Sequence, residues 1–375
     1  MAARVTGASS DQVMFALTLI AAVVSSLALY WMLQCVINDP REAALGMLIV
    51  LTLGTLHLVI NYFWTGVVSV NNLAFLRRYV PSAAFPFLFI FCGAVLRAVR
   101  LADWRRKLFW IGLAGLSFTV LVYSYFFLWT AALAWFCCFS IILVLVTKEE
   151  RIGAIGTLGG AGVLMALSLS PYFILISQRV HSTDQALALE LTRRPDLFRL
   201  TEVLGFVALL GLVYVVRHKN HGVTNETLVF TAALALTPFV VFNQQLIHGR
   251  SLQPFHYGLF VVNYVAIAAL FITLVLVCRT LSSREQKIWR VAIYALTFLA
   301  VLSGAYQALL AGRRYAAANF LRDSALPAMR QLAVMGRSAQ GQSLDTNSLV
   351  LCTDVTVADT LPTVAPQPIM WAPHM

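Results

Sequence analysis

The chain has 375 residues, of which 60% are hydrophobic and only 11% are charged. Soluble domains carry roughly 25% charged residues, so this composition excludes a soluble globular enzyme, a disordered chain and a disulfide-stapled secreted domain. The net charge of +11 fits a membrane protein, because cytoplasmic loops collect Lys and Arg. No polar segment interleaves basic and aromatic residues, so nucleic acid is not an expected partner.

Apolar runs, taken in chain order, predict an all-α polytopic membrane protein with about ten transmembrane helices. A spanning helix needs roughly 20 apolar residues, and each run is near that length. The expected spans are 13–36, 43–69, 81–99, 107–123, 126–146, 153–177, 201–216, 227–247, 258–278 and 288–310.

The long apolar run over 107–146 needs a break. As one helix it would extend about 60 Å, twice the roughly 30 Å of the bilayer core. We therefore expect two helices joined by a tight turn at Tyr123, Ser124 and Tyr125.

Two features inside the spans need an explanation. His57 and Asn61 share one helical face, which predicts an interhelical hydrogen bond, with a proton or substrate role as the alternative. Gly156 and Gly160 have the spacing that permits close helix approach. A phosphate-binding loop is the rival interpretation of this glycine-rich stretch, but no GxxxxGK[ST] pattern follows.

Basic residues orient the predicted helices. The loops with more Lys and Arg should be cytoplasmic, which places the N-terminus, the 178–200 loop, the 248–257 loop and the C-terminal tail outside. We expect a transmembrane domain over 1–310 and an extracytoplasmic tail over 311–375. A helix at 314–336 followed by strands near 348–352 and 368–371 predicts a small α/β segment, and the tail looks incomplete.

The six cysteines show no CxxC pair and no Cys/His ligand spacing, so we expect packing roles for them. On the predicted outer side, the 178–200 loop carries mixed charge typical of a solvated face. It also holds a dense set of acidic residues. The aromatic turn over 123–129 fits an interfacial aromatic belt, or a stacking platform for a sugar or prenyl chain.

The segment 242–257 has the strongest functional pattern. Three amides end an apolar helix, a Gly-Arg pair follows, and Pro-Phe-His-Tyr opens the next helix. Amides donate and accept hydrogen bonds as hydroxyl-rich ligands require, and Arg suits phosphate. A polar interfacial turn is the alternative. The candidate substrate-binding residues are Asn243, Gln244, Gln245, Arg250, His256 and Tyr257, with Tyr125 from the aromatic turn.

Segment 242–257 resembles a turn in bacterial membrane glycosyltransferases of the GT-C class, and the turns at 123–130 and 77–81 look similar to the same class. The resemblance implies transfer of a sugar from a polyprenyl-phosphate donor to an envelope acceptor at the outer face of the bacterial inner membrane. The implied partners are the lipid-linked sugar and membrane lipid. No cofactor is implied with certainty, and the sequence neither demands nor excludes a divalent metal.

One departure from the class concerns its catalytic acid, which lies in the first extracytoplasmic loop. Here only Asp11 precedes the first span, and Asp39 falls on the predicted cytoplasmic side. Either the topology is inverted, or the first helix and its acidic loop are absent. We therefore name no catalytic base from the sequence, and we expect a fragment that lacks the first helix with its acidic loop and the C-terminal end. The alternative functions are a transporter or flippase for a lipid-linked or small polar substrate, and a non-catalytic protein of envelope assembly.

Overall fold

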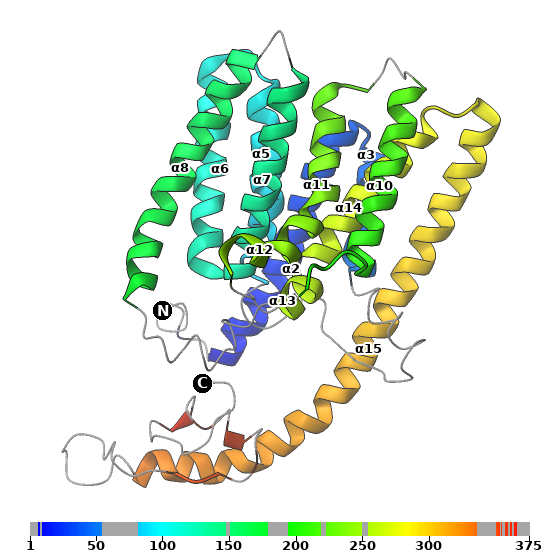
Figure 1. The fold of residues 1–375 in the computed structure, drawn as a ribbon. Coiled ribbons are helices and arrows are strands. Elements are labelled where there is room, and N and C mark those ends of the chain that lie inside the picture. The colour runs from blue at the N-terminus through cyan, green and yellow to red at the C-terminus, as the bar shows by residue number, and fades with distance from the viewer. Residues whose placement is uncertain are drawn as a thin grey trace. The chain divides into compact units, whose positions relative to one another are not determined.

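The computed structural model describes residues 7, 10–54, 82–147, 151–178, 194–218, 223–249 and 254–335, with single positions between 350 and 365. Contacts divide the chain into two units, Met1–Ala305 and Tyr306–Met375. The helices, in chain order, are α2 (Ser10–Ile37), α3 (Pro40–Leu53), α5 (Phe85–Arg100), α6 (Trp104–Ser124), α7 (Phe126–Val146), α8 (Arg151–Ser177), α10 (Leu200–Arg217), α11 (Asn225–Asn243), α12 (Gln245–His248), α13 (Pro254–Phe260), α14 (Val262–Cys278) and α15 (Ser283–Met335) (Figure 1).

The chain is an all-α polytopic membrane protein, as the composition predicts. Among the described residues, 7 helices are long and apolar enough to cross a membrane. They are Phe15–Ile37, Trp104–Ser124, Phe126–Val146, Ile152–Ser177, Leu200–Arg217, Asn225–Asn243 and Ser283–Leu310. The predicted break in the 107–146 run is confirmed, since α6 ends at Ser124 and α7 begins at Phe126.

The other three expected spans correspond to shorter described helices. The 81–99 run forms α5 with 16 residues, and the 258–278 run divides into α13 with 7 residues and α14 with 17. The 43–69 run includes α3, which ends at Leu53, and residues 55–81 lie outside the described part of the chain, with His57 and Asn61 among them.

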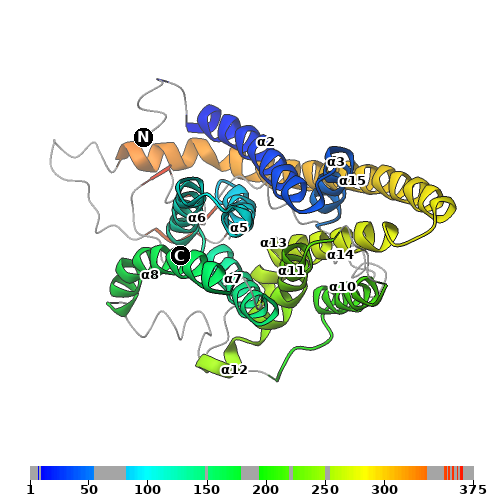
Figure 2. The same cartoon turned by 90° about the horizontal axis from the view of Figure 1, so that it is seen from above.

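The first unit is a helical bundle with an aromatic core. Helix α5 packs on α2 and α6, while α11 packs on α7, α10 and α14. Figure 2 shows α5 to α8 on one side of this unit and α10, α11 and α14 on the other. The rings of Phe91 and Trp135 meet edge to face at 5.8 Å, and Trp135 contacts Phe230 at 5.2 Å. Large apolar side chains also cover the outside, as on Leu145 at 65% exposure, which suits a surface in lipid.

Close helix contacts use other glycines than the expected pair. A Cβ at Gly156 would meet no atom within 4 Å, and one at Gly160 would only touch Ile111. At Gly205 on α10, by contrast, a Cβ would overlap the carbonyl oxygen of Ala235 on α11. Within the described chain, the spacing that permits close approach is therefore not used for it at Gly156 and Gly160, whereas Gly205 lies against the backbone of the neighbouring helix.

The second unit begins inside α15, which continues to Met335 and covers the helix expected at 314–336. Met329 and Ala333 of α15 form a small buried cluster with Leu361 and Ala365. No strand element occurs among the described positions of this unit, and residues 366–375, where the second strand was expected, lie outside them.

Candidate functional site

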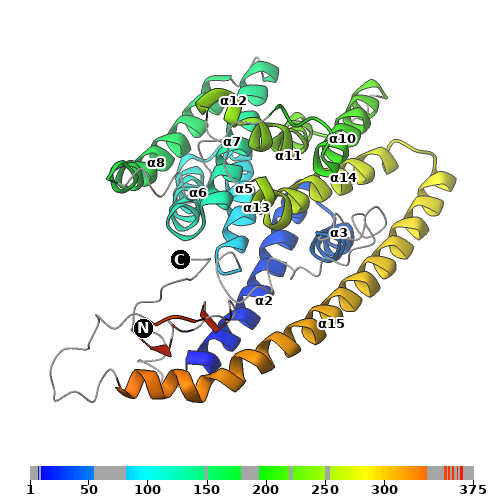
Figure 3. The ribbon, with the colours of Figure 1, turned by 60° about the horizontal axis from the view of Figure 1, so that its bottom comes forward.

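The described parts of segment 242–257, residues 242–249 and 254–257, lie at the end of the bundle where α11 ends and α7 and α10 begin. Helix α11 stops at Asn243, Gln244 follows as a single turn residue, and α12 covers Gln245–His248. Gly249 ends α12 with φ of 70°, a left-handed conformation that glycine adopts without strain, and its N–H donates to the Gln245 carbonyl at 2.9 Å. Figure 3 shows α12 and α13 close to the ends of α7 and α11.

Asn243 ties the end of α11 to the segment before α10. Its Oδ1 accepts from the backbone N–H of Asp196 at 2.8 Å, and its Nδ2 donates to the Asp196 carbonyl at 2.7 Å. The same Nδ2 donates to the Phe239 carbonyl at 2.9 Å and lies 3.5 Å from Glu202 Oε1. These bonds satisfy the amide, so Asn243 holds two segments that are 47 positions apart in sequence.

Glu202 is a fully buried carboxylate in the first turn of α10. Its Oε2 accepts from the backbone N–H of Arg199 at 2.9 Å, which fixes the start of the helix. Burying a carboxylate costs free energy unless hydrogen bonds compensate, and the Arg199 N–H and the Asn243 amide supply them.

A second carboxylate, Asp196, lies closer to solvent. Its Oδ2 forms an ion pair with Arg199 Nε at 2.9 Å, and the side chains of Asp196 and Arg199 are 19% and 38% exposed. The Arg199 guanidinium also lies over the Phe242 ring, 4.7 Å from its centroid. The pair therefore presents an accessible carboxylate and an accessible cation side by side.

Tyr257 lies at the centre of a directed hydrogen-bond chain. Gln244 Nε2 donates to the Tyr257 hydroxyl at 2.9 Å, and that hydroxyl lies 2.8 Å from Thr130 Oγ1. Thr130 Oγ1 in turn donates its proton to the Phe126 carbonyl at 3.0 Å. The hydroxyl proton between Thr130 and Tyr257 therefore comes from Tyr257, which donates to Thr130 Oγ1. The Tyr257 hydroxyl therefore accepts one hydrogen bond and donates another.

The aromatic turn and the 242–257 segment meet through two ring contacts. The ring of His256 stacks on Phe127 with centroids 4.8 Å apart, and Phe127 contacts Tyr257 edge to face at 4.9 Å. Tyr125 packs beside Phe127 at 5.4 Å and stays half-buried. Two regions that the sequence singled out separately therefore form one site, together with the Asp196 segment.

The candidate substrate-binding residues named from the sequence differ in what they contact. Asn243, Gln244 and Tyr257 are bonded within the protein, and Gln245 is buried with Nε2 at 3.5 Å from the Arg194 carbonyl. Arg250 lies outside the described residues. Sequence reasoning missed Glu202, Arg199, Thr130 and Phe127 as parts of the site. The Glu at the third position of an apolar helix was the available signal for Glu202, since that position often caps a helix.

No group of three or more His, Cys, Asp or Glu side chains among the described residues could hold a metal ion. The six cysteines are all free thiols, and Cys35, Cys92 and Cys278 are buried. Comparison of the chain with protein-family models and with curated proteins found no match.

Proposed function

We propose that the protein is a membrane glycosyltransferase that moves a sugar from a polyprenyl-phosphate donor to an acceptor hydroxyl at the outer face of the membrane. The observation that carries the proposal is the Asp196–Arg199 pair, an accessible carboxylate and cation joined at 2.9 Å at one end of the bundle. Glu202 and Asn243 brace this pair from the buried side. Sugar transfer uses a carboxylate to deprotonate the acceptor hydroxyl and a cation to stabilise the leaving phosphate, so both groups must lie at the same site.

The chemistry assigns a task to each group. Asp196 accepts the proton of the acceptor hydroxyl as its oxygen attacks the anomeric carbon of the sugar. The bond between that carbon and the phosphate oxygen breaks, and the polyprenyl phosphate leaves with the electron pair. Arg199 stabilises the negative charge on the departing phosphate, and Arg250 and His256 are further candidates for that task.

The surroundings of the pair suit a lipid-linked donor. Leu197 and Phe198, directly between Asp196 and Arg199, are 56% and 89% exposed, and Leu246 and Ile247 of α12 are 59% and 89% exposed. Such large apolar side chains beside a polar cluster mark a surface that contacts lipid or another apolar partner. A prenyl chain on this surface would bring its phosphate to Arg199.

The test is donor turnover by the full chain in nanodiscs, with a panel of radiolabelled undecaprenyl-phosphate sugars and release of undecaprenyl phosphate as the readout. Asp196→Asn should lower kcat by about a hundredfold or more, the usual contribution of a general base. Arg199→Gln should weaken donor turnover as well, because the leaving phosphate loses its nearest cation.

Matched controls lie at the opposite ends of the same helices. Arg217→Gln at the far end of α10 and Glu226→Gln at the start of α11 remove the same charges away from the site and should leave turnover unchanged. Turnover that survives both Asp196→Asn and Arg199→Gln would refute the proposed roles. Absence of turnover with every donor would refute the glycosyltransferase assignment.

The same proposal includes the finer architecture. We place about ten spans in the bundle, with α3, α5 and the α13–α14 pair as parts of three of them. The C-terminal segment is then a small extracytoplasmic α/β unit, and the membrane is a bacterial inner membrane. A transporter role would depend on His57 and Asn61, outside the described residues, whereas the described polar cluster at a bundle end favours an enzyme at the membrane surface.

A further inference from the structure

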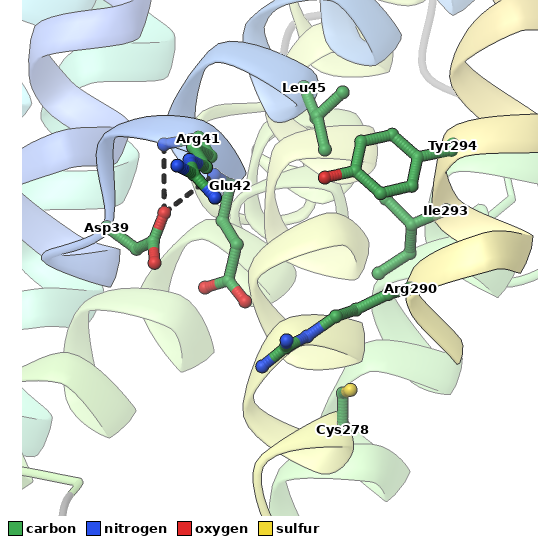
Figure 4. Close-up of a pocket in the computed structure, with 8 residues that line it drawn as sticks. All are labelled: Asp39, Arg41, Glu42, Leu45, Cys278, Arg290, Ile293 and Tyr294. Atoms are coloured by element: carbon green, nitrogen blue, oxygen red, sulfur yellow. Dashed lines mark hydrogen bonds between the residues drawn. The ribbon is translucent and has the colours of Figure 1, made fainter. Parts of the chain in front are cut away.

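A second polar site lies at the opposite end of the bundle, where α2 and α14 end and α3 and α15 begin. A pocket of about 130 Å³ is lined there by Asp39, Arg41, Glu42, Leu45, Cys278, Arg290, Ile293 and Tyr294 (Figure 4). A water molecule occupies about 30 Å³ of liquid, so the pocket has room for a larger polar group. All of these residues belong to the first unit.

The charges around the pocket do not cancel. Arg279 Nη2 lies 2.6 Å from Glu42 Oε2 and donates to the Ile37 carbonyl at 2.9 Å, so the Glu42 charge is compensated. Within the described part of the chain, the guanidinium groups of Arg41 and Arg290 make no ion pair or hydrogen bond. Asp39 is the remaining carboxylate, which leaves an excess of one positive charge.

Asp39 is fixed in position by the start of α3. Its Oδ1 accepts from the backbone N–H groups of Arg41 at 2.8 Å and Glu42 at 3.0 Å. The Glu42 N–H, and then that of Arg41, hold the pKa of Asp39 below its ordinary value, so the carboxylate stays ionised. Because Oδ1 accepts both bonds, Oδ2 can accept from a ligand hydroxyl.

The pocket lies near the end of the candidate span of α2 and the start of the candidate span of α15, where lipid headgroups are expected. The span of α2 ends at Ile37, α14 ends at Cys278, and the span of α15 begins at Ser283. Residues 290–294 follow about two turns later, or roughly 10 Å along the helix. On the same helix, Val291 and Phe298 are 67% and 64% exposed, which gives acyl chains an apolar surface next to the pocket.

We propose that this pocket binds the phosphodiester headgroup of an anionic glycerophospholipid. Arg41 and Arg290 contact the phosphate, and Asp39 accepts from a headgroup hydroxyl. One negative charge on the phosphodiester neutralises the excess positive charge of the site. Basic pockets between membrane helices are a recognised setting for anionic lipids. This site is separate from the Asp196–Arg199 pair and does not depend on its function.

The experiment uses the full chain in micelles that contain equal amounts of phosphatidylglycerol and phosphatidylcholine with the same acyl chains. Native mass spectrometry counts the lipid that each variant retains. The wild type should retain phosphatidylglycerol in preference to phosphatidylcholine. Arg290→Gln should lower retention of phosphatidylglycerol by about tenfold, since a charge-assisted hydrogen bond is lost.

Two further variants separate a binding role from a folding defect. Arg284→Gln removes the same charge from the exposed first turn of α15, away from the pocket, and should retain the lipid as the wild type does. Arg290→Lys keeps the charge and should recover part of the retention. The thermal-unfolding midpoint without added lipid should be equal in all variants, because Arg290 has no partner in the described chain.

Three results would overturn the proposal. One is an equal loss of phosphatidylglycerol retention in Arg290→Gln and Arg284→Gln, or no loss in either variant. The second is equal retention of the two lipids by the wild type. The third is a rise in the unfolding midpoint with 10 mM inorganic phosphate but none with phosphatidylglycerol, which would assign the pocket to a soluble phosphate.

Discussion

At the scale of single residues, the polar groups around Asp196 and Asn243 divide into those that hold the site and those that a substrate can reach. Asn243 is hydrogen-bonded to the backbone of Asp196, and Gln244 donates to the Tyr257 hydroxyl. The side chains of the Asp196–Arg199 pair, by contrast, stay partly exposed. Amides in a sequence signal hydrogen bonding, but the sequence does not name the partner. For Asn243 the partner is 47 positions away, and only the fold supplies it.

Replacement of Asn243 tests its holding role. Asn243→Ala should lower the free energy of unfolding by about 2–3 kcal/mol, because buried Glu202 loses an amide partner and Asp196 loses two backbone bonds. Asn225→Ala, at the exposed start of the same helix, should change it by about 0.5 kcal/mol or less. Unfolding by SDS titration of the reconstituted protein measures both, and equal effects would contradict the holding role.

At the scale of helices, contact distance depends on which glycines face a neighbour. The sequence spacing of Gly156 and Gly160 matches a close-approach motif, yet a Cβ at Gly156 would enter open space. At Gly205, by contrast, the helix passes directly over the Ala235 carbonyl. The spacing rule describes one helix, whereas close approach depends on the rotation of two helices toward each other.

A pair of Gly→Ala variants should therefore have effects of opposite sign. Gly205→Ala should destabilise the protein by about 1–3 kcal/mol, because the new methyl group forces α10 away from α11. Gly156→Ala should be neutral or stabilise by up to about 1 kcal/mol, since Ala favours an open helix position. SDS unfolding compares them. A neutral Gly205→Ala would show that α10 and α11 are not in close contact there.

At the scale of the whole molecule, the apolar residues exceed what a core can bury. Phe91, Trp135 and Phe230 fill the interior of the first unit, while Leu145 and many like it face outward. This distribution is what lipid solvation permits, and it supports the assignment as a multi-pass membrane protein. The side of the membrane on which each end lies is a separate question, which the basic residues address.

Cys352 offers a direct test of that orientation. It is the cysteine of the C-terminal unit, whereas the other five lie on α2, α5, α7 and α14. A membrane-impermeant maleimide should label Cys352 in intact cells, because we place the tail outside. Cys352→Ser should abolish the labelling. Labelling that appears only after permeabilisation would invert the predicted topology and place the Asp196–Arg199 pair on the cytoplasmic side.

By itself, the sequence determined the class of the fold and the positions of the seven described helices that are long enough to span a membrane. Length and hydropathy suffice for this, because a spanning helix must pair its own backbone N–H and C=O groups and must contain about 20 apolar residues. The turn at Tyr125 followed from the same arithmetic. The sequence also marked 123–130 and 242–257 as chemically unusual.

Only the tertiary structure decided how those segments combine. It placed Phe127 against His256, joined Thr130 to Tyr257, and brought the Asp196–Arg199 pair beside Phe242. It also created the Asp39–Arg290 pocket from four helix ends. The physical reason is the same in each case, because hydrogen bonds, ring contacts and ion pairs act over a few ångströms in space. Helix rotation and pairing set those distances, and local sequence patterns do not encode them.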